Sequence, residues 1–145
     1  RTIEAVLWSE RITRIDTLVI SHADTDHFNA VPGLLARFRV GEMLVPEPLL
    51  ASRSIAVAEL LASASVYGVP IRTARAGDAF AIDPLCRVRV LHPSPGEAST
   101  FLSNNESSLV LSIEAAGRRV LLTGDLEGRA LAAFNETHPG PCDVL

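Results

Sequence analysis

Two hydrophobic periods that follow one another along the chain are the feature that most constrains its fold. Apolar residues recur with helical spacing over residues 27–38, whereas over residues 86–90 they alternate strictly with arginine, as in a half-buried strand. Helical segments lie between strand-like ones, and other strand-like segments are joined by short turns such as residues 115–117. A chain that mixes hairpins with helices between strands predicts a layered α/β sandwich.

The expected elements cover most of the chain. We expect the valines of residues 86–90 to face the core and the arginines to face solvent. Pro32 is compatible with the first turn of its helix, because the N–H that it lacks has no partner there. The expected helices are residues 3–10, 27–38, 54–67 and 128–135, and the expected strands are residues 16–20, 42–45, 70–74, 79–82, 86–90, 109–113 and 118–123, with the start of another at 142–145.

Length and composition fit one domain spanning residues 1–145. Hydrophobic residues make up 48% of the chain, but no run approaches the roughly 18 apolar residues of a membrane-spanning helix, so we expect no membrane contact. The net charge of −4 argues against a protein that coats nucleic acid through bulk electrostatics. All 13 basic residues are arginine, which suits phosphate but also fits the codon usage of a GC-rich genome.

The segment at residues 21–27 carries the strongest chemical signal. His22, Asp24, Asp26 and His27 fall within six residues, between an expected buried strand and an expected helix. Side chains at the mouth of a sheet can converge, and imidazoles and carboxylates are ligands of divalent transition metals. The alternative is a solvated acidic loop in which Asp26 caps the helix. Two residues of each type at this spacing favour the metal site.

A second acidic residue follows another expected strand. Residues 120–125 read Val-Leu-Leu-Thr-Gly-Asp, an expected buried strand that ends in Gly124 and Asp125. Glycine lets the backbone turn sharply and approach a site closely. A Gly-Asp pair alone is a common turn. Together with the His/Asp loop it predicts a carboxylate at the same edge of the sheet, able to bridge two metal ions.

These motifs resemble those of the metallo-β-lactamase superfamily. The His-x-Asp-x-Asp-His stretch at residues 22–27 is similar to the family's second motif, and residues 121–127 are similar to its later strand-end Asp motif. Asp24 in place of the usual second His, the Asn-Asn-x-x-Ser-Leu-Val-Leu stretch at residues 104–111, and residues 117–127 resemble the C-terminal domain of ComEC-type competence proteins, the membrane channels of bacterial DNA uptake. The resemblance covers nearly the whole chain and implies a metallo-β-lactamase-like αββα sandwich.

The resemblance implies a centre of one or two divalent metal ions, Zn²⁺ or Mn²⁺. Asp24 makes the first site harder and more anionic than an imidazole would, which shifts its preference towards Mn²⁺ or Mg²⁺. Asn105 lies where many relatives have a histidine, and its amide oxygen is a weaker ligand. The implied ligands are His22 and Asp24 for the first ion, Asp26 and His27 for the second, Asp125 as the bridge, and Asn105.

The implied chemistry is metal-assisted hydrolysis, with Asp26 and Asp125 as catalytic residues. A hard two-metal site suits phosphodiesters better than β-lactams, so we expect a phosphodiesterase or nuclease that acts on DNA during competence-type uptake. One alternative is a hydrolase of a small ester, thioester or lactone, since the fold hosts many substrates. The other is a non-catalytic domain with a degraded metal site, which the asparagines at 104 and 105 favour.

The resemblance also implies that the domain is incomplete at both ends. The family's opening strands, with their Asp-Val-Gly-Gln-Gly-Asp type of motif, are missing, and its final His-His-Gly-Ser motif would follow residues 142–145. The first residue is Arg1 rather than Met, so we expect a fragment of a longer parent. If ComEC-like, that parent is a bacterial inner-membrane protein with this domain soluble; otherwise we expect a cytoplasmic protein. The oligomeric state stays open.

The remaining histidines and the cysteines carry weaker signals. His92 ends a strand beside a proline, and we expect a surface histidine rather than one that lines the site. His138 lies in a polar turn and is expected to be solvated. Cys86 and Cys142 have no CxxC spacing, which excludes a zinc ribbon and leaves a disulfide unsupported. We expect both to be small core residues on strands.

Overall fold

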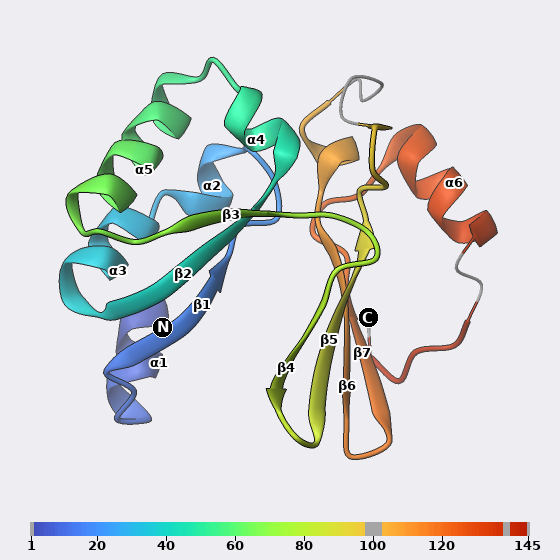
Figure 1. Ribbon diagram of the computed structural model, residues 1–145, viewed down its shortest axis with the longest axis horizontal. Helices are drawn as coiled ribbons and strands as arrows, with labels where there is room; N and C mark the ends of the chain where they lie inside the picture. The colour runs from blue at the N-terminus through green and yellow to red at the C-terminus, as the bar shows by residue number, and fades with distance from the viewer. Residues whose placement is uncertain (1, 98–102, 138–139, 145) are drawn as a thin grey trace.

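The computed structural model describes residues 2–97, 103–137 and 140–144. Helices alternate with strands in the first part of the chain, and strands follow one another directly in the second part (Figure 1). The elements of the first part are α1 (Ile3–Ser9), β1 (Arg14–Val19), α2 (Thr25–Phe28), α3 (Val31–Arg37), β2 (Arg39–Pro46), α4 (Glu47–Ala51), α5 (Ile55–Val66) and β3 (Ile71–Ala74). Those of the second part are β4 (Ala79–Asp83), β5 (Cys86–His92), the 3₁₀ helix η2 (Asn105–Ser107), β6 (Val110–Ala115), β7 (Arg118–Leu122) and α6 (Gly128–Thr137).

The strands form two sheets that pack face to face, with helices on the outside of each (Figure 1). The first sheet is parallel, in the order β1-β2-β3, and the second is antiparallel, in the order β4-β5-β6-β7. The parallel pairs need crossovers, which the helices between the strands supply, whereas tight turns suffice for the antiparallel pairs. The predicted αββα sandwich is confirmed.

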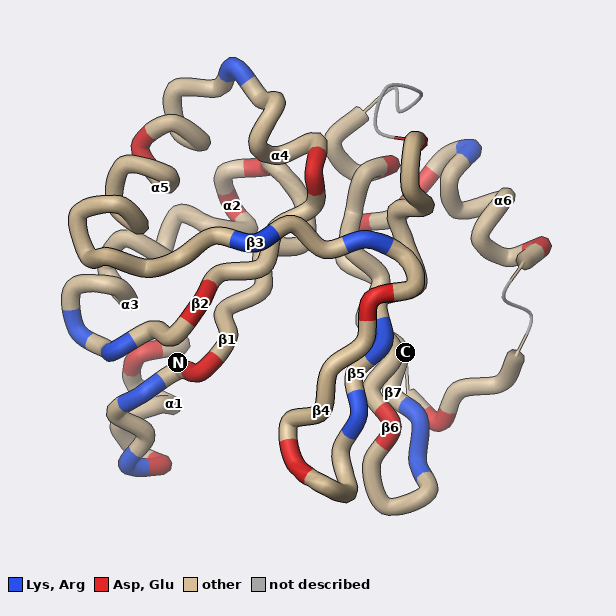
Figure 2. Tube along the Cα trace, viewed as in Figure 1, with Lys and Arg blue, Asp and Glu red and all other residues tan. Residues whose placement is uncertain are grey.

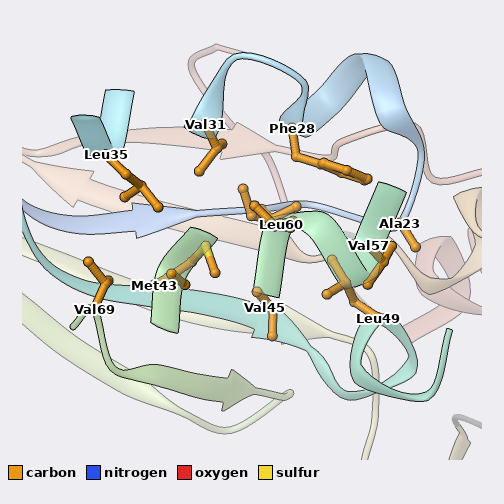
Figure 3. Close-up of a cluster of buried hydrophobic side chains, with 12 residues drawn as sticks. Ala23, Phe28, Val31, Leu35, Met43, Val45, Leu49, Val57, Leu60 and Val69 are labelled. Carbon is orange, nitrogen blue, oxygen red and sulfur yellow. The ribbon is translucent and has the colours of Figure 1, made fainter. Parts of the chain in front are cut away.

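Three hydrophobic clusters fill the spaces between the layers, and the central strand β2 contributes to two of them. Met43 and Val45 on β2 are fully buried against the helices, in the cluster shown in Figure 3 together with Leu60 of α5. Leu44, which points to the opposite face, packs in the second cluster with Val90 and other residues of the second sheet. This alternation follows from the period of two in a strand. A strand with both faces buried reads as a continuous apolar run.

The third cluster holds α6 against the outer face of the second sheet. Phe134 of α6 packs with Val110, Leu121 and Leu126. On the inner strand β5 of that sheet the predicted alternation of residues 86–90 is confirmed, because both valines are buried and both arginines are exposed. The predicted burial of residues 120–125 is wrong in part, since Leu121 is buried but Leu122 is 47% exposed. The strand β7 therefore has one face towards the core and the other towards solvent.

The helix predicted over residues 27–38 is two helices instead. α2 ends at Phe28 and α3 begins at Val31, with Pro32 in its first turn. Proline cannot donate to a carbonyl in the preceding turn, so the backbone can restart a helix at this point but not continue one through it. Phe28 and Val31 both lie in the helix-facing core, so the break keeps the apolar residues on one side. Periodicity alone could not reveal the interruption.

Other differences concern element ends and exposure. The second predicted strand is longer than expected and includes Gly41. Glycine is needed at this position, because a Cβ there would stand 2.5 Å from the carbonyl oxygen of Asp16 on β1. The helix α4 was not predicted. The helix α1 has no buried residue, although the Trp8 ring packs on Phe38 with ring centroids 5.3 Å apart. Within the described residues, no helix has the length and apolar character to cross a membrane.

The predictions for the isolated cysteines and histidines have mixed outcomes. Cys86 and Cys142 are free thiols, both half-buried, and Cys86 lies on β5 as expected. Cys142 packs against the third cluster without belonging to a strand. The prediction of a surface histidine at position 92 is wrong, because His92 is only 5% exposed. His138 lies outside the described residues.

Candidate metal centre

Two loops from different sheets meet at one rim of the sandwich. The first follows β1 and leads through His22 into α2, and the second follows β7 and leads through Asp125 towards α6. Backbone hydrogen bonds fix the first loop, since Ile20 N donates to Leu44 O at 2.9 Å and Leu109 N donates to Ser21 O at 2.8 Å. The second of these bonds joins the end of β1 to the start of β6, so the two sheets meet where the candidate ligands lie.

The structure brings together two imidazoles and one carboxylate from these loops. His22, His27 and Asp125 each offer one ligand atom, and the three atoms lie within 4.8 Å of one another. The shortest contact joins His27 Nε2 to Asp125 Oδ2 at 3.2 Å. His22 is fully buried, whereas Asp125 is exposed, so the cluster opens to solvent on the carboxylate side. Residues 22 and 125 are distant in sequence and adjacent at the rim.

Two further carboxylates flank the histidines, one beside each ring. Asp24 Oδ2 lies 3.5 Å from His22 Nε2, and Asp26 Oδ2 lies 3.7 Å from His27 Nε2. Asp26 projects from the first turn of α2 and its side chain is 80% exposed. The alternative in which Asp26 caps the helix is wrong, because the N-cap position is Asp24 and its side chain makes no capping hydrogen bond. Both carboxylates are thus free of a helix-capping role.

The Nδ1 atoms of the two rings face serine hydroxyls. Ser21 Oγ lies 3.0 Å from His22 Nδ1 and 3.3 Å from His27 Nδ1. Ser108 Oγ, which is fully buried, lies 3.2 Å from His22 Nδ1. The two rings are 4.1 Å apart between centroids. Each imidazole therefore has at least one hydroxyl at Nδ1 and at least one carboxylate at Nε2.

Gly124 lets the second loop come close enough to complete this arrangement. Its φ is +54°, in the left-handed region that favours glycine. A Cβ at this position would lie 3.0 Å from the Cβ of Ser21 and 3.1 Å from both the Cβ and the Oγ of Ser108. The glycine is therefore required both for the backbone turn and for the approach of the second loop to the two serines. This agrees with the close approach expected from the sequence.

The protonation state of His22 suits a metal ligand. Burial lowers the pKa of His22, and the neighbouring His27 lowers it further, while the surrounding carboxylates oppose these effects. A neutral imidazole has a free lone pair on one nitrogen, as metal binding requires. His22 Nε2 is buried with no hydrogen-bond partner among the described residues. Buried polar atoms normally have a partner, and a cation beside Asp24 and Asp125 would supply one. The donor set fits a divalent metal ion.

The two asparagines of η2 and its N-cap take different roles. Asn104 Nδ2 donates a hydrogen bond to Asp24 Oδ1 at 2.6 Å, which leaves the other oxygen of Asp24 facing His22. Asn105 Oδ1 is buried and has no hydrogen-bond partner among the described residues. An unpartnered amide oxygen is compatible with the ligand role expected for Asn105, which stays a prediction.

Sequence reasoning missed three residues that contact the expected ligands, namely Ser21, Ser108 and Asn104. Ser21 is next to His22 in the sequence, and this adjacency was the only signal for it. Ser108 is buried, and its backbone is fixed by His92, whose Nδ1 donates a hydrogen bond to the Ser108 carbonyl oxygen at 2.9 Å. The hydroxyl contacts depend on the meeting of two sheets, which no local pattern reports.

Comparisons with known proteins agree with this arrangement. A family model described as the metallo-beta-lactamase superfamily matches residues 2–143. ComE operon protein 3 of Bacillus subtilis (strain 168) is 35% identical to the chain over 121 residues. That match covers 83% of this chain but only 15% of the relative, so the chain spans a small part of that protein's length. The family match spans both loops, the one that carries His22 and the one that carries Asp125.

Proposed function

Because the chain belongs to the metallo-beta-lactamase superfamily, we propose that it is a metal-dependent hydrolase whose substrate is a phosphodiester of DNA. The observation that carries the proposal is the convergence of His22, His27 and Asp125 within 4.8 Å at the rim of the sandwich. The superfamily is one of mostly metal-dependent hydrolases, and the cluster has the ligand types that its divalent ions require.

The three clustered residues are proposed as the primary ligands. Asp24 and Asp26, at 3.5 and 3.7 Å from the Nε2 atoms of the two rings, extend the site on either side. Asn105 is proposed to add its amide oxygen to the first site. A divalent ion held there would lower the pKa of a coordinated water and act as a Lewis acid towards the scissile group.

The chain's own residues would supply orientation and proton transfer. Burial lowers the pKa of His22, which favours the neutral ring whose lone pair can bind a metal ion. Asp26 stands exposed at the mouth of the site, where a carboxylate can accept a proton from water and pass it to solvent. Asp125, fixed after Gly124, is proposed to bridge the sites and to orient the attacking water. These are the catalytic roles expected from the sequence for Asp26 and Asp125.

The negative charge at the rim of the sandwich favours binding of an anionic substrate only after a cation has bound there. Figure 2 shows acidic positions on α2 and near the start of α6, whereas basic positions are spread over both halves of the molecule. Three carboxylates near two imidazoles would repel a phosphodiester unless a divalent cation neutralised them. DNA as the substrate is supported by the resemblance to competence proteins and by the similarity to ComE operon protein 3. We infer that DNA engages this site only when metal is bound.

A nuclease assay tests the proposal. Single- and double-stranded DNA would be incubated with the full chain and Mn²⁺ or Zn²⁺, with and without a chelator. The variant Asp26→Ala is expected to lose cleavage. Asp16→Ala is the matched control, because the Asp16 side chain is 82% exposed, close to the 80% of Asp26, and pairs with Arg14 on the far end of β1. Cleavage that persists in Asp26→Ala would contradict the proposed catalytic role.

Two other outcomes would replace the proposal. Metal-dependent hydrolysis of a small ester, thioester or lactone, without cleavage of DNA, would favour a small-molecule hydrolase. Hydrolysis of none of these substrates, together with weak or no metal binding, would favour a non-catalytic domain with a degraded metal site. His22 Nε2 is buried without a hydrogen-bond partner among the described residues, so metal binding is the shared expectation of the two hydrolase functions.

A further inference from the structure

We propose that Ser21, assisted by Ser108, is the positioning residue of the metal centre, with its hydroxyl accepting from the Nδ1 atoms of both histidines. The proposal rests on the proposed function, since it assigns an outer shell to the same site. The carrying observation is that one hydroxyl oxygen lies 3.0 Å from His22 Nδ1 and 3.3 Å from His27 Nδ1. A single side chain thus contacts both imidazoles on the side away from the carboxylates.

The hydrogen-bond capacity of the hydroxyl fits this role. A neutral imidazole that binds metal through Nε2 carries its proton on Nδ1 and needs an acceptor there. A hydroxyl oxygen has two acceptor lone pairs, so Ser21 Oγ can accept from both rings. The carboxylates of Asp24 and Asp125 stand at the Nε2 side. The serine therefore selects, for both histidines at once, the tautomer that faces Nε2 to the cation.

The two serines differ in what they hold. Ser108 Oγ contacts His22 Nδ1 at 3.2 Å, and no contact between this hydroxyl and His27 is seen among the described residues. His22 thus has two hydroxyl partners, whereas His27 has Ser21 as its hydroxyl partner. Ser108 is itself fixed by the hydrogen bond from His92 Nδ1 to its carbonyl oxygen. Loss of Ser21 should therefore disturb His27 most, because Ser108 can still serve His22.

The partners of the histidines at Nδ1 are uncharged serine hydroxyls, and there is an electrostatic reason for this. Metal-bound histidines often donate to a carboxylate, which raises the basicity of the ring. Here three carboxylates already surround the Nε2 side, and a further buried anion behind the rings would add repulsion and a desolvation cost. Serine hydroxyls fix the rings without adding charge. Negative charge stays concentrated on the side where the cation binds.

Metal affinity measured by titration calorimetry with Zn²⁺ is the first test. Ser21→Ala is expected to weaken binding by about 10–100-fold, the usual effect of losing a partner of a metal-bound histidine. Ser21→Thr, which keeps the hydroxyl, should retain most of the affinity. Ser112→Ala is the control, because Ser112 is a buried serine within β6, where it pairs with Arg89 and Leu121 of the neighbouring strands. Urea unfolding of each metal-free variant establishes whether a loss of affinity reflects a loss of folding.

Nitrogen NMR of the zinc-loaded protein with isotope-labelled histidine separates positioning from general stability. In the unsubstituted chain both Nδ1–H protons should exchange slowly with water. In Ser21→Ala the His27 Nδ1–H signal should be lost to exchange while that of His22 persists. In Ser108→Ala both signals should persist, because Ser21 still accepts from each ring. A merely structural role would not produce this asymmetry.

The experiments can overturn the role of Ser21 and the proposed function independently of each other. Unchanged zinc affinity in Ser21→Ala, or an equal loss in Ser112→Ala, would overturn the role of Ser21. Retention of the His27 signal in Ser21→Ala would do the same. A chain that binds zinc with the expected dependence on Ser21 but hydrolyses nothing would support the inference and overturn the proposed function.

Discussion

Gly124→Ala perturbs the point where the second loop approaches the first, and its cost can be worked from the structure. The residue has φ +54°, and an added Cβ would lie 3.0–3.1 Å from atoms of Ser21 and Ser108. The left-handed conformation costs a non-glycine residue about 1–2 kcal/mol. Crowding against two packed serines adds about 1–3 kcal/mol, as for other small-to-large changes in a packed site. We expect a total loss of about 2–5 kcal/mol in the free energy of unfolding.

Gly117→Ala isolates the contribution of the crowding. Gly117 also has a positive φ, +73°, but apart from its chain neighbours no heavy atom of the described residues lies within 4 Å of its Cβ position. This variant should lose only the conformational part, about 1–2 kcal/mol. Urea unfolding of both metal-free variants gives the difference directly. Zinc titration should show weaker binding for Gly124→Ala only, because only this change displaces the serines that contact the histidines.

Equal destabilisation of the two alanine variants would refute the reasoning. It would mean that the serines move aside at no cost, and that the close approach at Gly124 does not fix the position of Asp125. Unchanged zinc affinity in a destabilised Gly124→Ala would separate the packing argument, which would stand, from the argument that the serines hold the metal ligands.

Three other predictions concern the core, the pH dependence and the start of α6. Leu60→Ala, at a residue 1% exposed, should cost about 2–5 kcal/mol in urea unfolding, whereas Ile55→Ala, at a residue 79% exposed, should change stability by less than about 0.5 kcal/mol. Since the pKa of His22 is lowered in the folded state, the unfolded chain binds the proton more readily, and the metal-free protein should lose stability as the pH falls below about 6.5. His22→Gln should flatten this dependence of the free energy of unfolding on pH. An unchanged dependence would contradict the assignment of the effect to His22. Glu106→Ala should lower the free energy of unfolding by about 1.5–3 kcal/mol, measured by thermal or urea unfolding. The reason is that the buried carboxylate of Glu106 accepts a hydrogen bond from Arg129 N at 3.0 Å in the first turn of α6. A smaller effect would show that solvent replaces this hydrogen bond.

The sequence by itself determined the alternation of helices and strands, the αββα class and the first loop of candidate metal ligands. These features are local: the valines of residues 86–90 report a half-buried strand through their spacing, and His22 to His27 lie within six residues. The motif at Gly124 and Asp125 could be recognised for the same reason. The family followed from motif order, which is also written along the chain.

Only the tertiary structure decided which of these residues meet and what holds them. Pro32 divides a continuous helical pattern into α2 and α3, and His92 is buried although its position beside a proline indicated a surface residue. Ser108 reaches His22 only because the end of β1 is hydrogen-bonded to the start of β6. Contacts between residues so far apart in sequence arise when two sheets pack together, and the hydrophobic effect that drives this packing is non-directional. Local patterns therefore specify the candidate ligands, whereas the packed sandwich specifies which residues contact them.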